Sequence, residues 1–147
     1  MRTEEWRAFV RHGTRTGKLA TVQANGHPHV APVWFVLDTV TMAGGEERDE
    51  ILFNTGAGTA KGRALRRDPR FSLCVDDENP PYSFVLLQAE ATITEDLDEM
   101  RAAATRIAAR YVGEDQAEAY GNRNAVPGEL LIRAPVTKVI AQADLAG

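Results

Sequence analysis

Residues 20–36 read ATVQANGHPHVAPVWFV and contain the strongest hairpin signal in the chain. Side chains of residues 19–24 alternate with the period of a strand. Asn25-Gly26 is a favoured two-residue turn, because both residues tolerate positive φ. A return strand is expected from about residue 29 to residue 37. Pro32 inside it predicts a sheet edge or a bulge, because proline donates no backbone hydrogen bond.

The rest of the chain continues a mainly-β pattern, with helices at the start, in one short crossover and late. A first helix is expected with Thr3 as its N-cap and Gly13 as its end. A polar loop is expected over residues 38–49. Further strands are expected at residues 51–55, 71–75 and 83–91 and as a pair within 130–142, and further helices at 61–67, 97–111 and 114–120. Many short strands with a strong hairpin predict a small β-barrel, built as one domain over residues 1–147.

Composition excludes several classes of protein. The 147 residues carry a net charge of −4, which argues against a protein that coats nucleic acid. The one cysteine, Cys74, cannot form an internal disulfide. Histidine and cysteine spacings that bind metals are absent, so we expect no metal. Without a long apolar run or a signal core, we expect no membrane association and a cytoplasmic location.

Residues 53–70, FNTGAGTAKGRALRRDPR, set one lysine and four arginines after a glycine-containing turn. Small residues such as Gly58 let the backbone approach a ligand, and Thr59 stands where an N-cap would. A helix N-terminus offers unpaired N–H groups and partial positive charge, so with Lys61 it is a natural seat for a phosphate. The alternative is a solvated amphipathic helix whose arginines lie at the surface. The G-x-x-x-x-G-K-[ST] pattern of a P-loop is absent.

The order of three segments carries a family resemblance. ATVQANGHPHVAPVWFV, then ILFNT, then TAKGRALRRDPRFSLCV resembles the split-barrel family of pyridoxamine phosphate oxidase-like flavoproteins. Within it the details resemble the actinobacterial branch that uses the deazaflavin coenzyme F-420. The similarity spans residues 17–91, with a weaker match around residues 130–141. It implies a six-stranded antiparallel split β-barrel of the FMN-binding type with peripheral helices, working as a homodimer with two cofactor sites at its interface.

The resemblance also implies how the cofactor phosphate is held. Relatives use a Ser/Thr-Arg-Lys element after the third strand, and the matching triplet here is Thr59, Ala60 and Lys61. The hydroxyl and the lysine are kept, whereas the arginine is replaced by alanine. An Arg and a Lys on the second strand of the flavin-dependent oxidases correspond to Ala31 and Val36. These departures argue against vitamin B6 oxidation and favour the deazaflavin branch.

Around the cofactor ring the resemblance implies three groups of residues. Pro32, Val33 and Trp34 are expected to flank the tricyclic system, with a plain core role for Trp34 as the alternative. Thr55 could bond the ring edge. Tyr82 resembles an aromatic residue that other members supply from the partner subunit, although it could equally pack locally. Arg63, with the arginines that follow it, could supply part of a cationic trail for the carboxylates of the cofactor tail.

The expected function is that of a deazaflavin-dependent reductase, which transfers hydride to an electron-poor double bond of a small substrate such as a quinone, an enone or a tetrapyrrole-like system. No catalytic residue is identified by the sequence. One alternative keeps the fold and binds FMN as an oxidoreductase. Another is a non-catalytic carrier of flavin or haem. A nucleic-acid contact through the arginines is disfavoured by the net charge.

Overall fold

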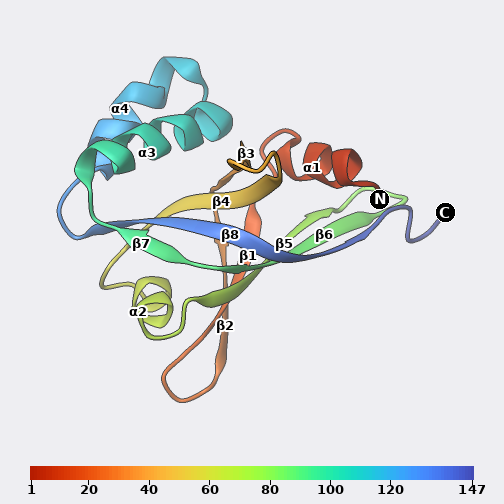
Figure 1. Ribbon diagram of the computed structural model, residues 1–147, viewed down its shortest axis with the longest axis horizontal. Coiled ribbons are helices and arrows are strands. Elements are labelled where there is room, and N and C mark those ends of the chain that lie inside the picture. Colours follow the sequence, from red (N-terminus) through yellow and green to blue (C-terminus); the bar gives the residue numbers. More distant parts are fainter.

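The computed structural model describes residues 1–147 and shows an antiparallel sheet with helices at its periphery (Figure 1). Eight strands form the sheet in the order β2-β1-β5-β6-β8-β4-β3, and β7 pairs with β8 off this path. The strands are β1 (Gly17–Val22), β2 (Pro28–Val33), β3 (Val36–Thr41), β4 (Glu47–Gly56), β5 (Arg70–Asp77), β6 (Ser83–Glu90), β7 (Thr92–Thr94) and β8 (Glu129–Gln142). The helices are α1 (Thr3–Arg11), α2 (Ala60–Arg67), α3 (Leu97–Val112) and α4 (Glu114–Asn124). The mainly-β fold class is confirmed, with eight strands where six were expected.

The hairpin of β1 and β2 forms, but its turn has three residues, Ala24 to Gly26, where two were expected. The Gln23 amide donates to the His27 carbonyl oxygen at 2.9 Å, and Asn25 does not adopt positive φ. Gly26 has a φ of +84°, and the side-chain oxygen of Asn25 accepts a hydrogen bond from the His27 amide at 3.0 Å. β2 lies at one edge of the sheet, so Pro32 is on an edge strand and leaves no ladder donor missing inside the sheet.

The return strand expected over residues 29–37 is wrong at Trp34 and Phe35, which separate β2 from β3. The backbone of Phe35 bonds to side chains of α3 instead of a strand. Its N–H donates to the Tyr111 hydroxyl at 3.3 Å, and its carbonyl oxygen accepts from Arg110 at 2.9 Å. These partners are about 75 residues away in sequence, so no local pattern reveals them.

The polar loop expected over residues 38–49 is also wrong, because β3 and β4 form a hairpin there around Gly45, whose φ is +86°. Four of the charged residues in this segment form ion pairs: Asp38, Glu47, Arg48 and Asp49. Arg7 of α1 is only 6% exposed, and its guanidinium donates to both oxygens of Asp49 at 2.9 and 3.0 Å and to Glu47 at 3.1 Å. A buried arginine thus allows polar residues to run as strands.

The last strand, β8, is continuous where a pair of strands was expected. Its first half pairs with β4 and β7, and its second half pairs with β6. The change of neighbour falls at Pro135, opposite Glu50, and Val136, opposite Ala89. β8 therefore belongs to both halves of the sheet and joins them.

The N-cap of α1 differs from prediction by one residue. The helix begins at Thr3 itself, and Arg2 occupies the N-cap position without a side-chain bond. The carbonyl oxygen of Arg2 already accepts from the amides of Glu5 and Trp6 at 3.0 Å, which extends the helix backwards.

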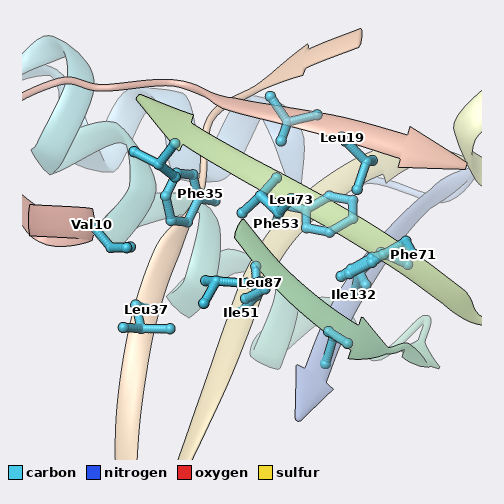
Figure 2. Close-up of a cluster of buried hydrophobic side chains, with 14 of the residues drawn as sticks. Val10, Leu19, Phe35, Leu37, Ile51, Phe53, Phe71, Leu73, Leu87 and Ile132 are labelled. Carbon is cyan, nitrogen blue, oxygen red and sulfur yellow. The ribbon is translucent and has the colours of Figure 1, made fainter. Parts of the chain in front are cut away.

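Two apolar clusters hold the elements together. The larger contains 18 buried residues inside the sheet, and Figure 2 shows Leu19, Phe35, Phe53 and Leu73 pointing into it. The smaller joins the helical layer to the opposite face of β4 and β8; its members are Leu52, Met100, Ala103, Ala125 and Leu131. Helices α3 and α4 consequently lie together over one part of the sheet (Figure 1). None of the four helices combines the length and apolarity needed to span a membrane.

Candidate functional site

A cavity of about 410 Å³ lies where the end of β4, the start of α2 and the helices α3 and α4 meet the residues after β2. Strand, turn and helix contribute to it from segments far apart in the sequence. Its lining residues are Pro32, Val33, Trp34, Asn54, Thr55, Gly56, Thr59, Lys61, Ala104, Ile107, Ala108, Tyr120, Asn124 and Glu129. Its volume is within the range of small-molecule and cofactor sites, about 300–1,000 Å³.

Thr59 caps α2 at one end of this cavity, as the sequence predicted. Its hydroxyl oxygen accepts from the Gly62 amide at 3.1 Å and donates to the carbonyl oxygen of Gly56 at 2.8 Å. Gly62 is required there, because a Cβ on it would lie 2.2 Å from that same carbonyl oxygen. Gly58, by contrast, has open space where a Cβ would lie and no positive φ, so the close backbone approach expected at Gly58 occurs at Gly62 instead.

The start of α2 carries unpaired positive groups. The amides of Ala60 and Lys61 have no acceptor, and the Lys61 ammonium has neither an ion pair nor a hydrogen bond. An isolated ammonium beside free helix amides is a favourable place for an anion, because the positive charge attracts it and the free N–H groups can donate hydrogen bonds to it.

The arginines of the basic segment, three in α2 and Arg70 at the start of β5, differ from Lys61. Each donates to another group of the protein: Arg63 to the Gly58 carbonyl oxygen, Arg66 to Glu95, Arg67 to the Val22 carbonyl oxygen and Arg70 to Asp68. All four are exposed, which agrees with the alternative of a solvated helix face for them. Only the lysine of this basic segment lines the cavity.

Trp34 forms an aromatic wall of the cavity. Its side chain is 43% exposed, so the alternative of a plain core role is excluded. The indole stacks on Tyr111 with ring centroids 5.1 Å apart and planes 5° apart. Burial raises the pKa of Tyr111, so its hydroxyl stays protonated at neutral pH.

Six of the predicted residues meet at this cavity, and three do not. Those that meet are Pro32, Val33, Trp34, Thr55, Thr59 and Lys61. Gly58 lies outside the lining. Arg63 lies with Arg67 in a separate groove of about 350 Å³, between α2 and the β1–β2 turn.

Tyr82 lies at a third hollow, with Lys18, Cys74 and Leu145 among its neighbours. It is 43% exposed and has a φ of +62°. Within one chain Tyr82 is therefore not part of the cavity, and a role for it there requires a second subunit.

Other residues reach the cavity from β4, from the helical layer and from the start of β8, and no sequence pattern points to them. The polar ones are Asn54, Tyr120, Asn124 and Glu129. The amide nitrogen of Asn54 is buried without a hydrogen-bond partner. Its neighbour Thr55 was selected through the resemblance, but nothing in the local pattern shows that the helices cover the opposite face of β4.

No three His, Cys, Asp or Glu side chains lie close enough together to hold a metal ion.

Comparison with known proteins gives a family match over nearly the whole chain. A family model described as Pyridoxamine 5'-phosphate oxidase matches residues 2–142. No match was found among the curated proteins.

Solved structures resemble the fold at low sequence identity. The conserved hypothetical protein Rv2991 from Mycobacterium tuberculosis has a TM-score of 0.77 and 24% identity, over 98% of this chain and 86% of that chain. An F-420 reductase has a TM-score of 0.67 and 22% identity, over 90% and 94% of the two chains. A FAD-binding protein from Mesorhizobium loti has a TM-score of 0.66 and 15% identity, over 96% and 92%. At these identities the likeness concerns the fold.

Proposed function

The chain belongs to the pyridoxamine 5'-phosphate oxidase family, and we propose that its cavity binds the deazaflavin coenzyme F-420 for the reduction of a small conjugated substrate. The observation that carries the proposal is that one cavity is lined both by the unpaired Lys61, at the start of α2, and by the exposed ring of Trp34. A cofactor with a phosphate at one end and a flat ring at the other matches both features.

The residues present fit such a group. The Lys61 ammonium and the amides of Ala60 and Lys61 would hold the phosphate, with Thr59 fixing the turn. Trp34 and Pro32 would cover the ring and exclude water from it. The hydroxyl of Thr55 is 3.1 Å from that of Thr59. Because Thr59 donates its proton to Gly56, Thr55 is the donor of this pair, and its oxygen remains able to accept a hydrogen bond from the ring edge.

When bound, a reduced deazaflavin supplies a hydride, and the protein contributes binding, orientation and exclusion of water. An acceptor with an electron-poor double bond, such as an enone, a quinone or a tetrapyrrole-like system, suits a hydride donor. The apolar side chains of α3 that line the cavity, Ala104, Ile107 and Ala108, offer a surface for such a substrate.

The preference for the deazaflavin over FMN rests on the groove beside α2. Arg63 and Arg67 line it together with Gln23 and Asn25, and no acidic side chain is among its lining residues. Each guanidinium donates one bond to a backbone carbonyl and retains further donors. A cofactor whose tail carries carboxylates would use these donors, whereas FMN ends at its phosphate.

FMN remains the second candidate, because the Lys61 seat suits its phosphate monoester equally well. A non-catalytic carrier of flavin or haem is the third candidate. Titration of the protein with oxidised and reduced coenzyme F-420, and separately with FMN, followed by fluorescence, distinguishes them. Tight deazaflavin binding with turnover of a quinone or an enone is expected. Tight FMN binding without deazaflavin binding would overturn the choice of cofactor, and deazaflavin binding without turnover would favour the carrier.

We further propose that the protein is a homodimer with its cofactor sites at the interface. The outer face of β2, β1, β5, β6 and β8 carries apolar and small side chains in two rows. Val30 and Ala20 pair with each other in one row. Cys74, Leu86 and Ile140 lie opposite one another in the next row, which continues through Lys18 to Pro32. Val30 is 64% exposed. Pro32 is on the same face and also lines the cavity, so a second copy seated on this face would border the site and could bring its own Tyr82 towards it.

Sedimentation of the parent and of Leu86→Arg tests the dimer. A dimeric parent is expected, together with a monomeric variant that binds the cofactor more weakly. A monomeric parent with full cofactor affinity would contradict it.

A further inference from the structure

Trp34, the aromatic wall of the cavity, lies where the sheet is interrupted between two strands. Trp34 and Phe35 lie between β2 and β3, where no strand ladder fixes the backbone. Phe35 is fully buried, whereas Trp34 is exposed toward the cavity. An indole at such a break would rotate freely unless other side chains held it.

Tyr111, near the C-terminal end of α3, contacts both the ring and the backbone of this break. Its ring is parallel to that of Trp34, with planes 5° apart and centroids at 5.1 Å. Its hydroxyl donates to the Arg15 carbonyl oxygen at 2.8 Å and accepts from the Phe35 amide at 3.3 Å. The phenol is therefore anchored on two segments while its ring face supports the indole.

Arg110 reinforces the same break without any acidic partner. Its guanidinium donates to three carbonyl oxygens, those of Val10 at 2.7 Å and of Gly13 and Phe35 at 2.9 Å. It also lies 4.8 Å from the Phe35 ring centroid and 5.0 Å from that of Tyr111. This end of α3 thus ties the break to the end of α1.

We propose that Tyr111 is a positioning residue, which holds the indole of Trp34 as a preset wall for a planar ligand ring. Tyr111 does not line the cavity, so it acts through Trp34. The inference rests on the proposed function for the identity of the ring. An indole that is already fixed loses less conformational freedom when the ring binds, so affinity is gained without a new contact.

A double-mutant cycle measures this action directly, with FMN as the probe. Tyr111→Leu removes the stack and the hydrogen bonds, and we expect it to weaken FMN binding about three- to tenfold, the effect of mobilising one side chain. Tyr111→Phe keeps the ring face and removes only the hydroxyl bonds, so a loss of about twofold is expected. In a Trp34→Leu background, Tyr111→Leu should have no further effect, because its target is gone.

Two readouts separate positioning from general loss of structure. Inhibition of FMN binding by inorganic phosphate should give the same phosphate affinity in every variant, because the Lys61 seat is untouched. In protein labelled with fluorotryptophan, two fluorine resonances are expected, for Trp6 and Trp34, and the second is assigned by its absence in Trp34→Leu. Its line shape should change in Tyr111→Leu even without ligand.

Equal losses from Tyr111→Leu in both backgrounds, or parent affinity in Tyr111→Leu, would overturn the proposal. If Tyr111→Leu does not fold, Tyr111→Met, which also removes the ring face, takes its place, and parent FMN affinity with an unchanged Trp34 resonance in that variant would likewise refute the proposal. Failure of the parent to bind FMN or coenzyme F-420 would refute the proposed function instead. In that case the Trp34 resonance of the free protein still decides the role of Tyr111.

Discussion

The turn that forms the anion seat makes a quantitative prediction about Gly62. Alanine is normally better than glycine inside a helix by about 1 kcal/mol. At this position, however, a Cβ would lie 2.2 Å from the carbonyl oxygen of Gly56, and its next neighbours are backbone atoms of Ala57 at 3.2 Å. Backbone rather than a flexible side chain must move, by most of an ångström. Overpacking of this kind costs about 1–3 kcal/mol, so Gly62→Ala is expected to destabilise the protein despite its helix propensity.

The same shift would disturb anion binding. The carbonyl oxygen of Gly56 accepts bonds from both the amide and the hydroxyl of Thr59, at 3.1 and 2.8 Å, so moving it loosens the cap of α2. Urea unfolding of the parent, Gly62→Ala and Gly58→Ala gives the comparison. Gly58 has open space and no positive φ, so its alanine variant should be neutral or more stable by up to about 1 kcal/mol. Equal stability of the two alanine variants would refute the steric argument.

Three further perturbations have expected outcomes. Lys61→Ala should weaken FMN or coenzyme F-420 by about 1.5–3 kcal/mol in fluorescence titrations, because a charged contact is lost, whereas Arg70→Ala should not; equal effects would contradict the seat. Asn54→Leu should leave the free energy of unfolding in urea unchanged or raise it, because a buried nitrogen without a partner is removed, yet weaken ligand binding; lowered stability would argue against this. The hydrogen bond from Arg106, with its charge, holds the pKa of Asp38 below its usual value, so the ionised form stabilises the fold at neutral pH and this contribution is lost as acid brings the pH down through the lowered pKa. Asp38→Asn should therefore unfold more easily than the parent at neutral pH and converge with it in acid, and a constant difference would contradict the linkage.

Local chemistry was enough to predict the β1–β2 hairpin and the cap of α2 by Thr59. Each depends on residues close in sequence, such as a turn that needs positive φ or a hydroxyl three residues before the amide that it accepts from. The helix N-terminus pointed to Lys61 and the resemblance added Trp34, and both line the cavity.

The predictions that were wrong concern segments whose stabilising partners are distant in sequence. The break at Phe35 is made by Tyr111 and Arg110, and the polar hairpin of β3 and β4 is stabilised by Arg7. Asn54 lines the cavity only because the helical layer packs over β4, and this packing cannot be read from the sequence around Asn54. Such contacts produce no periodic pattern in the sequence, because each is made by a single side chain that meets a segment far away along the chain.

The central claim is that an anion binds at the start of α2 while a flat ring lies against Trp34. A crystal structure of the protein with bound coenzyme F-420 or FMN tests it most directly. The account predicts phosphate oxygens within hydrogen-bond distance of the Lys61 ammonium and of the free amides of Ala60 and Lys61, with the cofactor ring stacked over the Trp34 indole. A phosphate held instead by Arg63 and Arg67 in the neighbouring groove, away from Lys61, would contradict it.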